Sequence, residues 1–445
     1  MESRRAGNPH DPMNKERLFR ASCLALIVTA MSFAIRGDIM AALGTEFALS
    51  NEQLGWVAGT AFWGFTLAML FGGPLCDVLG MGFLLRAAFV GHLGGILLTI
   101  FSTGFWPLFG GTLCIGLANG LVEAACNPLV ATLYPQEKTK RLNQFHVWFP
   151  GGIVIGGLLA FLFSLMHLDW RWKMAAMLVP LACYAGLFRG MRFPRTERVV
   201  SGVSTRGMFR ECARPLFLFM VVCMLGTSAS ELGPNQWIPS ILTENAGMPG
   251  ILILVWINGL MAAGRSMAGP VVHKLSPAGT LLFSSVFSAL GLLALSFARG
   301  PVPTLAAATL FSVGVCYFWP TMLGFTSERL PRTGALGLAI MGGAGMLSVS
   351  LVLPWMGHLY DWQILKYLGE GASIETLRNA AAGSQEAIRW AAATAAGGQG
   401  TLRIVALLPG MLLIAFALLY LRDRRQMGRQ AGVTDGVARG RERVG

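Results

Sequence analysis

Charged residues are scarce in this sequence, and their scarcity excludes an ordinary water-soluble domain. They make up 13% of the 445 residues, whereas a soluble domain uses about 25%. Hydrophobic residues make up 54% of the chain, and the mean hydropathy is +0.58. Apolar runs of about 20 residues, enough for a helix to cross a hydrocarbon core of roughly 30 Å, recur along the sequence. The sequence therefore predicts an integral membrane protein.

The apolar runs also lack the strict alternation of polar and apolar residues that barrel strands show. Backbone groups in lipid must bond within their own segment, which favours helices. We expect an all-α membrane protein of twelve transmembrane helices in two pseudo-symmetric six-helix bundles. The expected helices cover residues 19–43, 54–75, 82–102, 105–131, 144–166, 171–190, 214–240, 250–272, 278–297, 301–326, 334–357 and 401–421.

Motifs of enzymes and of ATP-driven pumps are missing. The chain has no nucleophile elbow, no phosphate-binding loop and no His/Cys cluster with metal-ligand spacing. None of its eight cysteines falls in a predicted outer loop, so no disulfide framework is indicated. We therefore expect no enzymatic activity, no metal and no other cofactor, and we expect an ion gradient to supply the energy for any transport.

Negative charge is rarer than positive charge, and the formal net charge is +13. Most Lys and Arg residues fall in segments that are on one side of the membrane if both termini are cytoplasmic, which matches the positive-inside rule. The basic balance then reflects topology rather than a nucleic-acid partner. We expect a monomeric multi-pass protein of the plasma (inner) membrane, with the lipid bilayer, protons and a small-molecule solute as its partners.

The predicted domain organisation follows from an Arg-rich segment in the middle of the chain. We expect a six-helix bundle over residues 1–190, a cytoplasmic linker over 191–213, a second bundle over 214–421 and a basic cytoplasmic tail over 422–445. The halves echo each other in their Asn127-Pro128 and Trp319-Pro320 pairs.

An outer insertion over 358–400 contains two helix-start patterns, Ser373-Ile-Glu375 and Ser384-Gln-Glu386. Each has an N-cap residue followed by an acid in the first turn. The patterns predict one or two short amphipathic helices on the outer surface. We expect these helices to be structural rather than part of a solute site.

Ionisable residues within the expected spans are few, and such residues usually face a cavity or one another. Asp38 and Glu123 are the candidate proton-coupling acids, because a carboxylate in low dielectric favours its protonated form and can exchange its proton with either side. The alternative is that each acid is the fixed structural partner of an arginine.

Polar and aromatic residues at middle depth predict a solute site. Glu231 is followed by Asn235, Gln236 and Trp237, and amides with an indole face suit a hydroxylated ligand. Arg36 lies about 200° from Asp38 around its helix and should meet another helix. The remaining candidate solute-binding residues are Asn119, Asn127, Gln144, His146, Trp148, Tyr317 and Trp319.

The turn after the second expected helix reads Gly73-Pro-Leu-Cys-Asp77-Val-Leu-Gly80 and resembles the loop signature of the major facilitator superfamily. The basic residues of that signature are replaced here, and Arg86 is a candidate substitute. Gly264-Arg265 begins a similar loop in the second half. The resemblance implies gating roles for Gly73, Asp77, Gly80, Arg86 and Arg265, and alternating access between two halves.

A narrower resemblance is to the fucose/glucose/galactose:proton symporters. Glu123 before Asn127-Pro128, then Arg141-Leu-Asn143, and Trp319-Pro-Thr321 resemble motifs of that family. The resemblance implies a sugar moved with protons. The alternatives are an organic anion or drug-like solute that binds Arg36 or Arg265, and a transporter-like sensor without net flux.

Overall fold

The computed structural model describes residues 12–49, 51–200, 202, 204–248, 250–369, 377 and 383–442. Helices dominate this part of the chain. The first half contains α1 (Pro12–Glu46), α2 (Asn51–Leu79), α3 (Met81–Ile100), α4 (Phe105–Leu133), α5 (Lys138–His146), α6 (Trp148–Leu165), α7 (Trp170–Ala175) and α8 (Leu178–Phe188). Two short helices follow, α9 (Glu197–Val200) and α10 (Thr205–Cys212). The second half contains α11 (Pro215–Ala246), α12 (Gly250–Ser266), α13 (Ala268–Leu295), α14 (Pro301–Val315), α15 (Phe318–Arg329), the 3-10 turn η1 (Pro331–Thr333), α16 (Gly334–Leu368), α18 (Gln385–Val405) and α19 (Leu407–Glu442).

Ten helical stretches in the described ranges are long and apolar enough to cross a membrane. The other two expected spans are present in a different form. The span expected over 171–190 consists of α7 and α8 in series, and the span expected over 250–272 contains the shorter apolar helix α12. These elements complete the twelve-span, all-α architecture that the hydropathy predicts.

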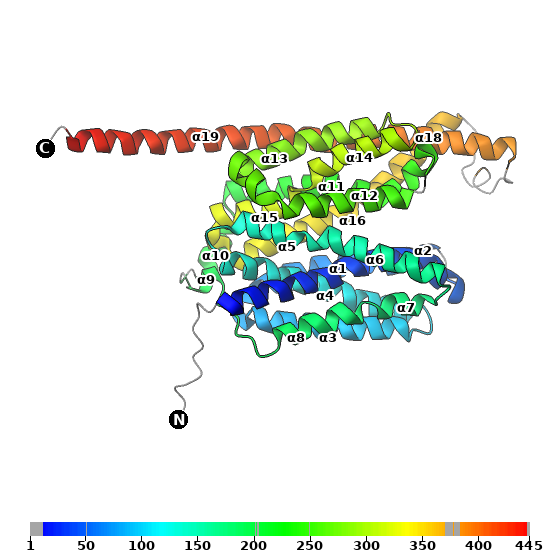
Figure 1. Ribbon diagram of the computed structural model, residues 1–445, viewed down its shortest axis with the longest axis horizontal. Helices are drawn as coiled ribbons and strands as arrows, with labels where there is room; N and C mark the ends of the chain where they lie inside the picture. The colour runs from blue at the N-terminus through cyan, green and yellow to red at the C-terminus, as the bar shows by residue number, and fades with distance from the viewer. Residues whose placement is uncertain are drawn as a thin grey trace, which may run out of the picture.

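Two halves lie one above the other in Figure 1, with α1 to α8 below and α11 to α19 above. Within the first half α2 and α3 pack against α4, and α1 packs against α6. Within the second half α13 packs against α14 and α19, and α11 packs against α16. The halves contact each other mainly through α2 with α16, α5 with α15, and α6 with α12. These three pairs define the interface that the solute site must share.

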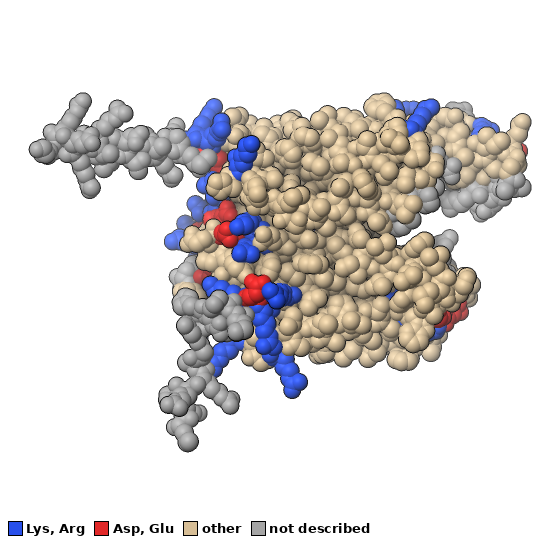
Figure 2. Space-filling view, viewed as in Figure 1, with Lys and Arg blue, Asp and Glu red and all other residues tan. Residues whose placement is uncertain are grey.

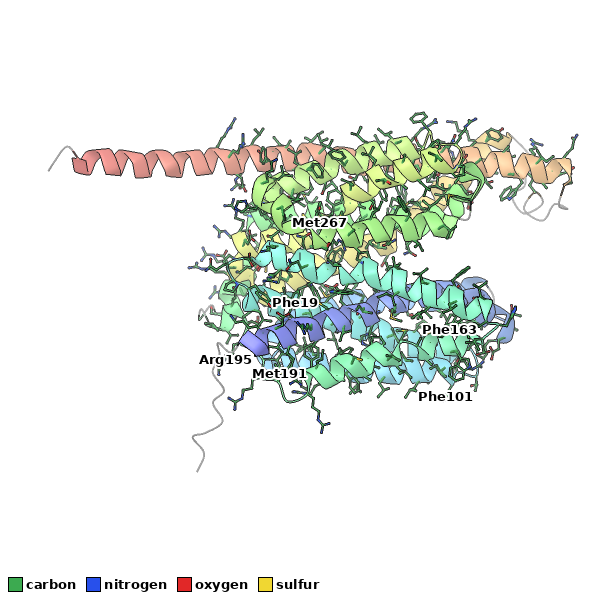
Figure 3. The ribbon with its side chains drawn as sticks, viewed as in Figure 1. Phe19, Phe101, Phe163, Met191, Arg195 and Met267 are labelled. Atoms are coloured by element: carbon green, nitrogen blue, oxygen red, sulfur yellow. The ribbon has the colours of Figure 1, made fainter. Side chains whose placement is uncertain are left out.

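The two ends of the bundle differ. We call the end where α1 begins and α19 leaves the bundle the termini end, and the opposite one the far end. Lys and Arg gather at the termini end, which also carries Met191 and Arg195, whereas Phe101 and Phe163 lie at the far end (Figures 2 and 3). The halves touch at the termini end and are separated by a notch at the far end (Figure 2). On this face the halves are thus in contact at the termini end and apart at the far end (Figure 2).

The segment between the last two spans is partly covered by the flanking helices, since α16 continues to Leu368 and α18 begins at Gln385. Ser384 caps α18 as expected, accepting a hydrogen bond from the Ala387 amide at 3.1 Å, whereas the Ser373 pattern lies outside the described residues. Ile364 and Leu368 pack with Ala393 in a small separate apolar cluster, which favours long paired helices over helices lying flat.

The predicted linker is partly helical, because it contains α9 and α10. Both short helices pack against η1 of the second half. The linker therefore contacts the opposite half rather than hanging free. The tail expected from residue 422 is helical as far as Glu442.

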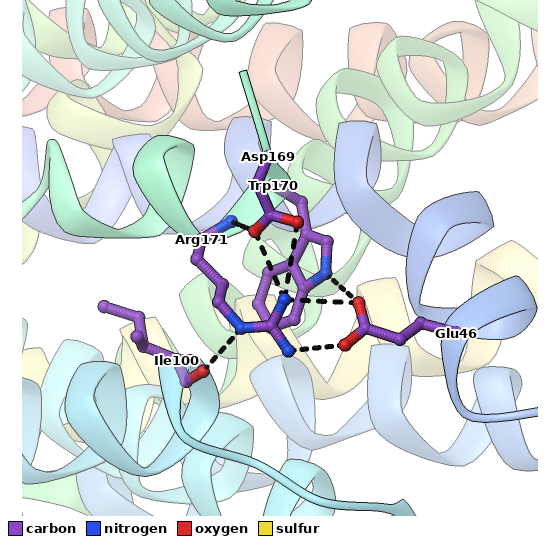
Figure 4. Close-up of polar contacts among 5 residues, drawn as sticks. All are labelled: Glu46, Ile100, Asp169, Trp170 and Arg171. Carbon is purple, nitrogen blue, oxygen red and sulfur yellow. Dashed lines mark hydrogen bonds and ion pairs between the residues drawn. The ribbon is translucent and has the colours of Figure 1, made fainter. Parts of the chain in front are cut away.

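A polar cluster at the far end joins three elements of the first half (Figure 4). Glu46 at the end of α1 pairs with Arg171 of α7 and accepts a hydrogen bond from the Trp170 indole at 2.5 Å. Arg171 Nε also donates to the Ile100 carbonyl at the end of α3, at 3.1 Å. Hydrogen bonds from Arg171 and Trp170 lower the pKa of the Glu46 carboxyl below its usual value. The cluster fixes α7 against α1 and α3.

Candidate functional site

A cavity lies at the interface of the two halves, at middle depth. Its empty volume is about 260 Å³, just below the roughly 300–1,000 Å³ of typical small-molecule sites. Three lining residues come from the first half and five from the second, and the full lining is Glu123, His146, Phe149, Glu231, Leu232, Arg265, Trp319 and Met346. Charged groups and apolar faces therefore share one small space, which suits a small polar solute.

Arg265 of α12 is the centre of the site. Its guanidinium forms an ion pair with Glu231 of α11 at 2.7 Å, and both side chains are almost completely buried. It also donates to two backbone carbonyls, to Cys316 at 2.6 Å and to His146 at 3.0 Å. His146 belongs to the first half, so one side chain connects both halves beside the cavity. Arg265, predicted as a gating residue or as a contact for an anionic solute, thus lines the central cavity.

The two carbonyls that Arg265 binds are free for a reason visible in the sequence. A helical carbonyl normally accepts from the amide four residues later, and proline has no amide hydrogen. Pro150 lies four residues after His146, and Pro320 lies four residues after Cys316. The chain also breaks there, between α5 and α6 and between α14 and α15. Each proline therefore leaves one acceptor that the Arg265 side chain satisfies.

Glu123 of α4 is connected to His146 through Asn127, one turn along the same helix. Asn127 Nδ2 donates to Glu123 Oε2 at 2.6 Å, and Asn127 Oδ1 lies 3.0 Å from His146 Nε2. The same histidine nitrogen lies 3.8 Å from Glu123 Oε2. All three side chains are buried. In the described part of the chain, Glu123 has no Lys or Arg partner within ion-pair distance.

Asp38 does not line this cavity. It lies toward the far end of α1, where its carboxylate pairs with Lys173 of α7 at 2.5 Å. Lys173 also donates to Ser164 at 2.7 Å. The geometry matches the alternative of a fixed structural partner, with a lysine in place of the arginine that we expected. Asp38 and Glu123 are therefore not brought together.

The candidate solute-binding residues separate into two groups. Glu231, His146 and Trp319 line the cavity, and Asn127 lies directly behind it. Asn235 is buried one turn from Glu231, and its Nδ2 donates to the Glu231 carbonyl at 2.8 Å. Arg36 is also buried, against the Phe33 ring. These residues remain candidates for solute contact.

The other candidates have partners elsewhere. Asn119 bonds to His92 and Ser32 inside the first half, Gln144 accepts from Arg141, and Tyr317 donates to the Gly264 carbonyl. Trp237 donates to the Leu353 carbonyl at 3.2 Å, while Gln236 and Trp148 are exposed. The amide cluster that the sequence predicts in α11 thus points in several directions, because residues 235, 236 and 237 are each about 100° apart on a helix.

The termini end is closed by contacts that sequence reasoning missed. Glu328 of α15 accepts from the Thr139 amide at 3.0 Å and from its hydroxyl at 2.6 Å. Lys138 pairs with Glu197 of the linker at 2.8 Å and donates to the Ser327 carbonyl at 3.3 Å. The available signal is the presence of oppositely charged residues in two loops of the termini end, six spans apart. We refer to Lys138, Thr139, Glu197 and Glu328 as the inner gate, a name that denotes only their place at the termini end.

The predicted gating residues around the turn between α2 and α3 contribute less directly to the closure of the termini end. Gly73 packs closely against α16, where an added Cβ would lie 3.1 Å from the Leu336 Cα, so a side chain there would push the halves apart. Asp77 accepts from Thr196 of the linker at 2.5 Å. Gly80 ends α2 with a φ of 83°, which favours glycine. Arg86 is exposed on α3, and the described residues show no contact between it and the inner gate.

Glu328→Gln is expected to loosen the inner gate. The substitution removes a charged acceptor of two hydrogen bonds, which at this partly exposed position stabilise the closed end by about 1 kcal/mol, or roughly fivefold in the population ratio. Ala131 is buried and lines a pocket together with Glu197 of the gate. A cysteine at this position, in a background without the native cysteines, should then react about fivefold faster with an impermeant maleimide.

Glu137→Gln is the matched control for this experiment. Glu137 lies in the same loop, but its partners Lys140 and Arg141 belong to its own half. Equal labelling rates in E328Q and E137Q would show that Glu328 does not hold the end closed.

The fold and the site together define a carrier: two helical halves with a small charged cavity between them, open at one end and closed at the other. The family model of the Major Facilitator Superfamily matches residues 22–362. The chain belongs to this superfamily, and it is a transporter rather than an enzyme.

Similar proteins carry different solutes. A D-xylose transporter of Levilactobacillus brevis is 28% identical over 34% of this chain and 33% of its own length. A gentisate transporter of Corynebacterium glutamicum is 22% identical over 50% and 52%. A putative niacin/nicotinamide transporter of Bacillus subtilis is 23% identical over 75% and 86%. The chain thus spans only a third to a half of the first two relatives.

Solved structures show the same fold. FucP, the E. coli fucose:proton symporter, was solved in the outward conformation and superposes with a TM-score of 0.67 at 17% identity, covering 90% of this chain and 98% of FucP. The proton:xylose symporter XylE has a TM-score of 0.67 at 15% identity, covering 89% and 95%. The human organic anion transporter MFSD10 has a TM-score of 0.67 at 12% identity, covering 90% and 99%.

Proposed function

We propose that this protein is a secondary active transporter that moves a small polar solute together with protons. The observation that carries the proposal is the environment of Glu123. Asp38 pairs with Lys173 and Glu231 pairs with Arg265, whereas Glu123 lines the cavity with no Lys or Arg within ion-pair distance among the described residues, and its polar contacts are Asn127 and His146. A buried carboxyl without a fixed cation can gain or lose a proton without leaving a partner charge unpaired. Glu123 is therefore our candidate for the proton carrier.

Alternating access is supported by the difference between the two ends. The inner gate joins the halves at the termini end, while the far end is open. Rocking of one half against the other would open the inner gate and close the notch, exposing the same cavity to the opposite side. The hydrogen bond from Arg265 to the His146 carbonyl crosses between the halves, so this motion acts directly on that bond.

The solute class has two candidates. A sugar is supported by the sequence motifs and by the neighbours that carry fucose and xylose. An organic anion is supported by the relatives that carry gentisate and by the anion transporter MFSD10. The cavity itself presents more charged groups and apolar faces than amides. This lining favours a solute with at least one charged group.

Orientation follows from the charge distribution. We propose that both termini face the cytoplasm and that the protein resides in the plasma (inner) membrane, because Lys and Arg gather at the termini end (Figure 2). In this orientation the notch opens outward. We further propose that the monomer is the working unit, with bundles over 1–190 and 214–421.

Substrate-induced proton uptake by the purified protein tests the proposed function. Liposomes that contain the protein should accumulate labelled solutes from a panel of sugars and organic acids when an inward proton gradient is imposed. Addition of the transported solute to the protein in weak buffer should raise the pH of the medium as protons are bound. Uptake that is indifferent to the gradient would remove proton coupling from the proposal, and binding without flux would favour a sensor.

A further inference from the structure

Arg36 is a buried cation without an acidic partner. Its side chain lies on α1 with only 8% exposure, and its guanidinium lies over the Phe33 ring, 5.1 Å from the centroid. Among the described residues, no ion pair or hydrogen bond to Arg36 is present. The other buried cations differ, since Arg265, Lys138 and Lys173 each contact a carboxylate. Burial of an unpaired guanidinium is unfavourable, so its persistence calls for a compensating anion.

Arg36 is linked to the cavity through two aromatic rings. The Phe33 ring beneath it contacts Phe149 at 6.0 Å between centroids, and Phe149 lines the cavity. Since α1 runs from the termini end to the far end (Figure 1), Arg36 lies about one helical turn beyond Phe33 toward the far end. Arg36 is therefore on the far-end side of the Phe33 ring, which packs against the cavity wall at Phe149.

Two acceptors on α11 are also without partners. Glu231 Oε2 and Asn235 Oδ1 are buried and accept no hydrogen bond within the described part of the chain. The residues are one helical turn apart, so their side chains lie on the same face of α11. Unsatisfied buried acceptors are unfavourable, and a ligand that brings hydroxyl or amine donors would satisfy them.

From these three groups we infer that the transported solute is a hydroxylated organic anion. Its carboxylate binds Arg36, its hydroxyl groups donate to Glu231 and Asn235, and its carbon skeleton packs against Phe149 and Trp319. A bidentate guanidinium–carboxylate contact explains the choice of arginine at position 36. The inference rests on the proposed transport function and names its solute class.

Matched pairs of solutes test the inference. We would measure binding and uptake of D-glucose against D-glucuronate, and of 4-hydroxybenzyl alcohol against 4-hydroxybenzoate, because the members of each pair differ in the carboxylate. The anionic member of at least one pair should bind, and the neutral member should bind about tenfold more weakly or not at all. A protein that binds the neutral members as well as the anionic ones, or that carries only an uncharged solute, would overturn the inference.

The Arg36→Gln variant gives a second, independent readout. It should weaken binding of the anion about tenfold or more, while Arg36→Lys restores part of the affinity. Without solute, R36Q should unfold at a temperature equal to or above that of the wild type, because it removes an unpaired buried charge. A purely structural role for Arg36 predicts the opposite, an unstable variant. Anion binding within twofold of the wild type in R36Q would also overturn the inference.

Arg403→Gln is the matched control, because Arg403 also lies over a phenylalanine ring, Phe297, at 4.4 Å, but it is exposed on α18. R403Q should leave anion binding unchanged. Failure of the proposed function is distinguishable from failure of this inference: the first appears as an absence of gradient-driven flux for every solute, and the second as flux or binding that ignores the carboxylate and Arg36.

Discussion

Glu123→Gln is expected to abolish gradient-driven accumulation while exchange of solute across the membrane persists. Glutamine keeps the size of the side chain and a hydrogen bond to Asn127, but it cannot carry a proton. With one proton per solute, an imposed gradient of one pH unit supports an accumulation ratio of about tenfold, and the variant should reach a ratio of about one. Uptake and counterflow in the same liposomes measure the two quantities.

Asp38→Asn is the informative control for that result. It removes an acid of the same half, but one that pairs with Lys173 away from the cavity. D38N should keep most of the pH-driven accumulation. If E123Q accumulated solute normally and D38N did not, the proton carrier would be Asp38, and our reading of the Glu123 environment would be wrong.

Arg265→Met is expected to destabilise the protein more than any other single change at the site. The substitution leaves the Glu231 carboxylate buried without a cation, and it leaves the carbonyls of His146 and Cys316 without a donor. Breaking a buried pair in this way costs about 3–5 kcal/mol of the free energy of unfolding. Denaturant unfolding of the purified protein in detergent measures the loss, and transport should be undetectable.

The double variant Arg265→Met with Glu231→Gln separates the charge from the hydrogen bonds. Removal of both charges should restore roughly half of the lost stability, because no unpaired ion remains. Additive losses in the double variant would indicate that the ion pair contributes nothing beyond its separate members.

Composition and hydropathy were sufficient to predict the class of fold. The low charge and the recurring apolar runs limit the chain to a helical membrane protein, and the loop around Gly73 and Asp77 indicates the superfamily. The spans at 171–190 and 250–272 were harder to delimit, because breaks such as that between α7 and α8 depend on tertiary packing. The extension of α16 and α18 was missed for the same reason.

The site was predicted only in part, because sequence does not show which groups meet across the two halves. Glu123, Glu231 and His146 were identified as rare polar residues in apolar surroundings, and they do share the cavity. For Arg265 the sequence predicts a gating role or, alternatively, contact with an anionic solute, but its bonds to the distant His146 and Cys316 carbonyls cannot be predicted from its neighbours in the sequence. Pro150 and Pro320 did carry a usable signal, because each predicts a free carbonyl four residues earlier.

The pairing of acids and bases at the far end has a consequence for leakage. Glu46 with Arg171 and Asp38 with Lys173 all belong to the first half, and no ion pair crosses between the halves there among the described residues. An empty carrier thus has few electrostatic contacts to hold the far end shut. A bound solute that contacts α1 and α11 together would bridge the two halves at the far end. Occlusion would then be favoured when solute is bound, and transport cycles of the empty carrier would be rare.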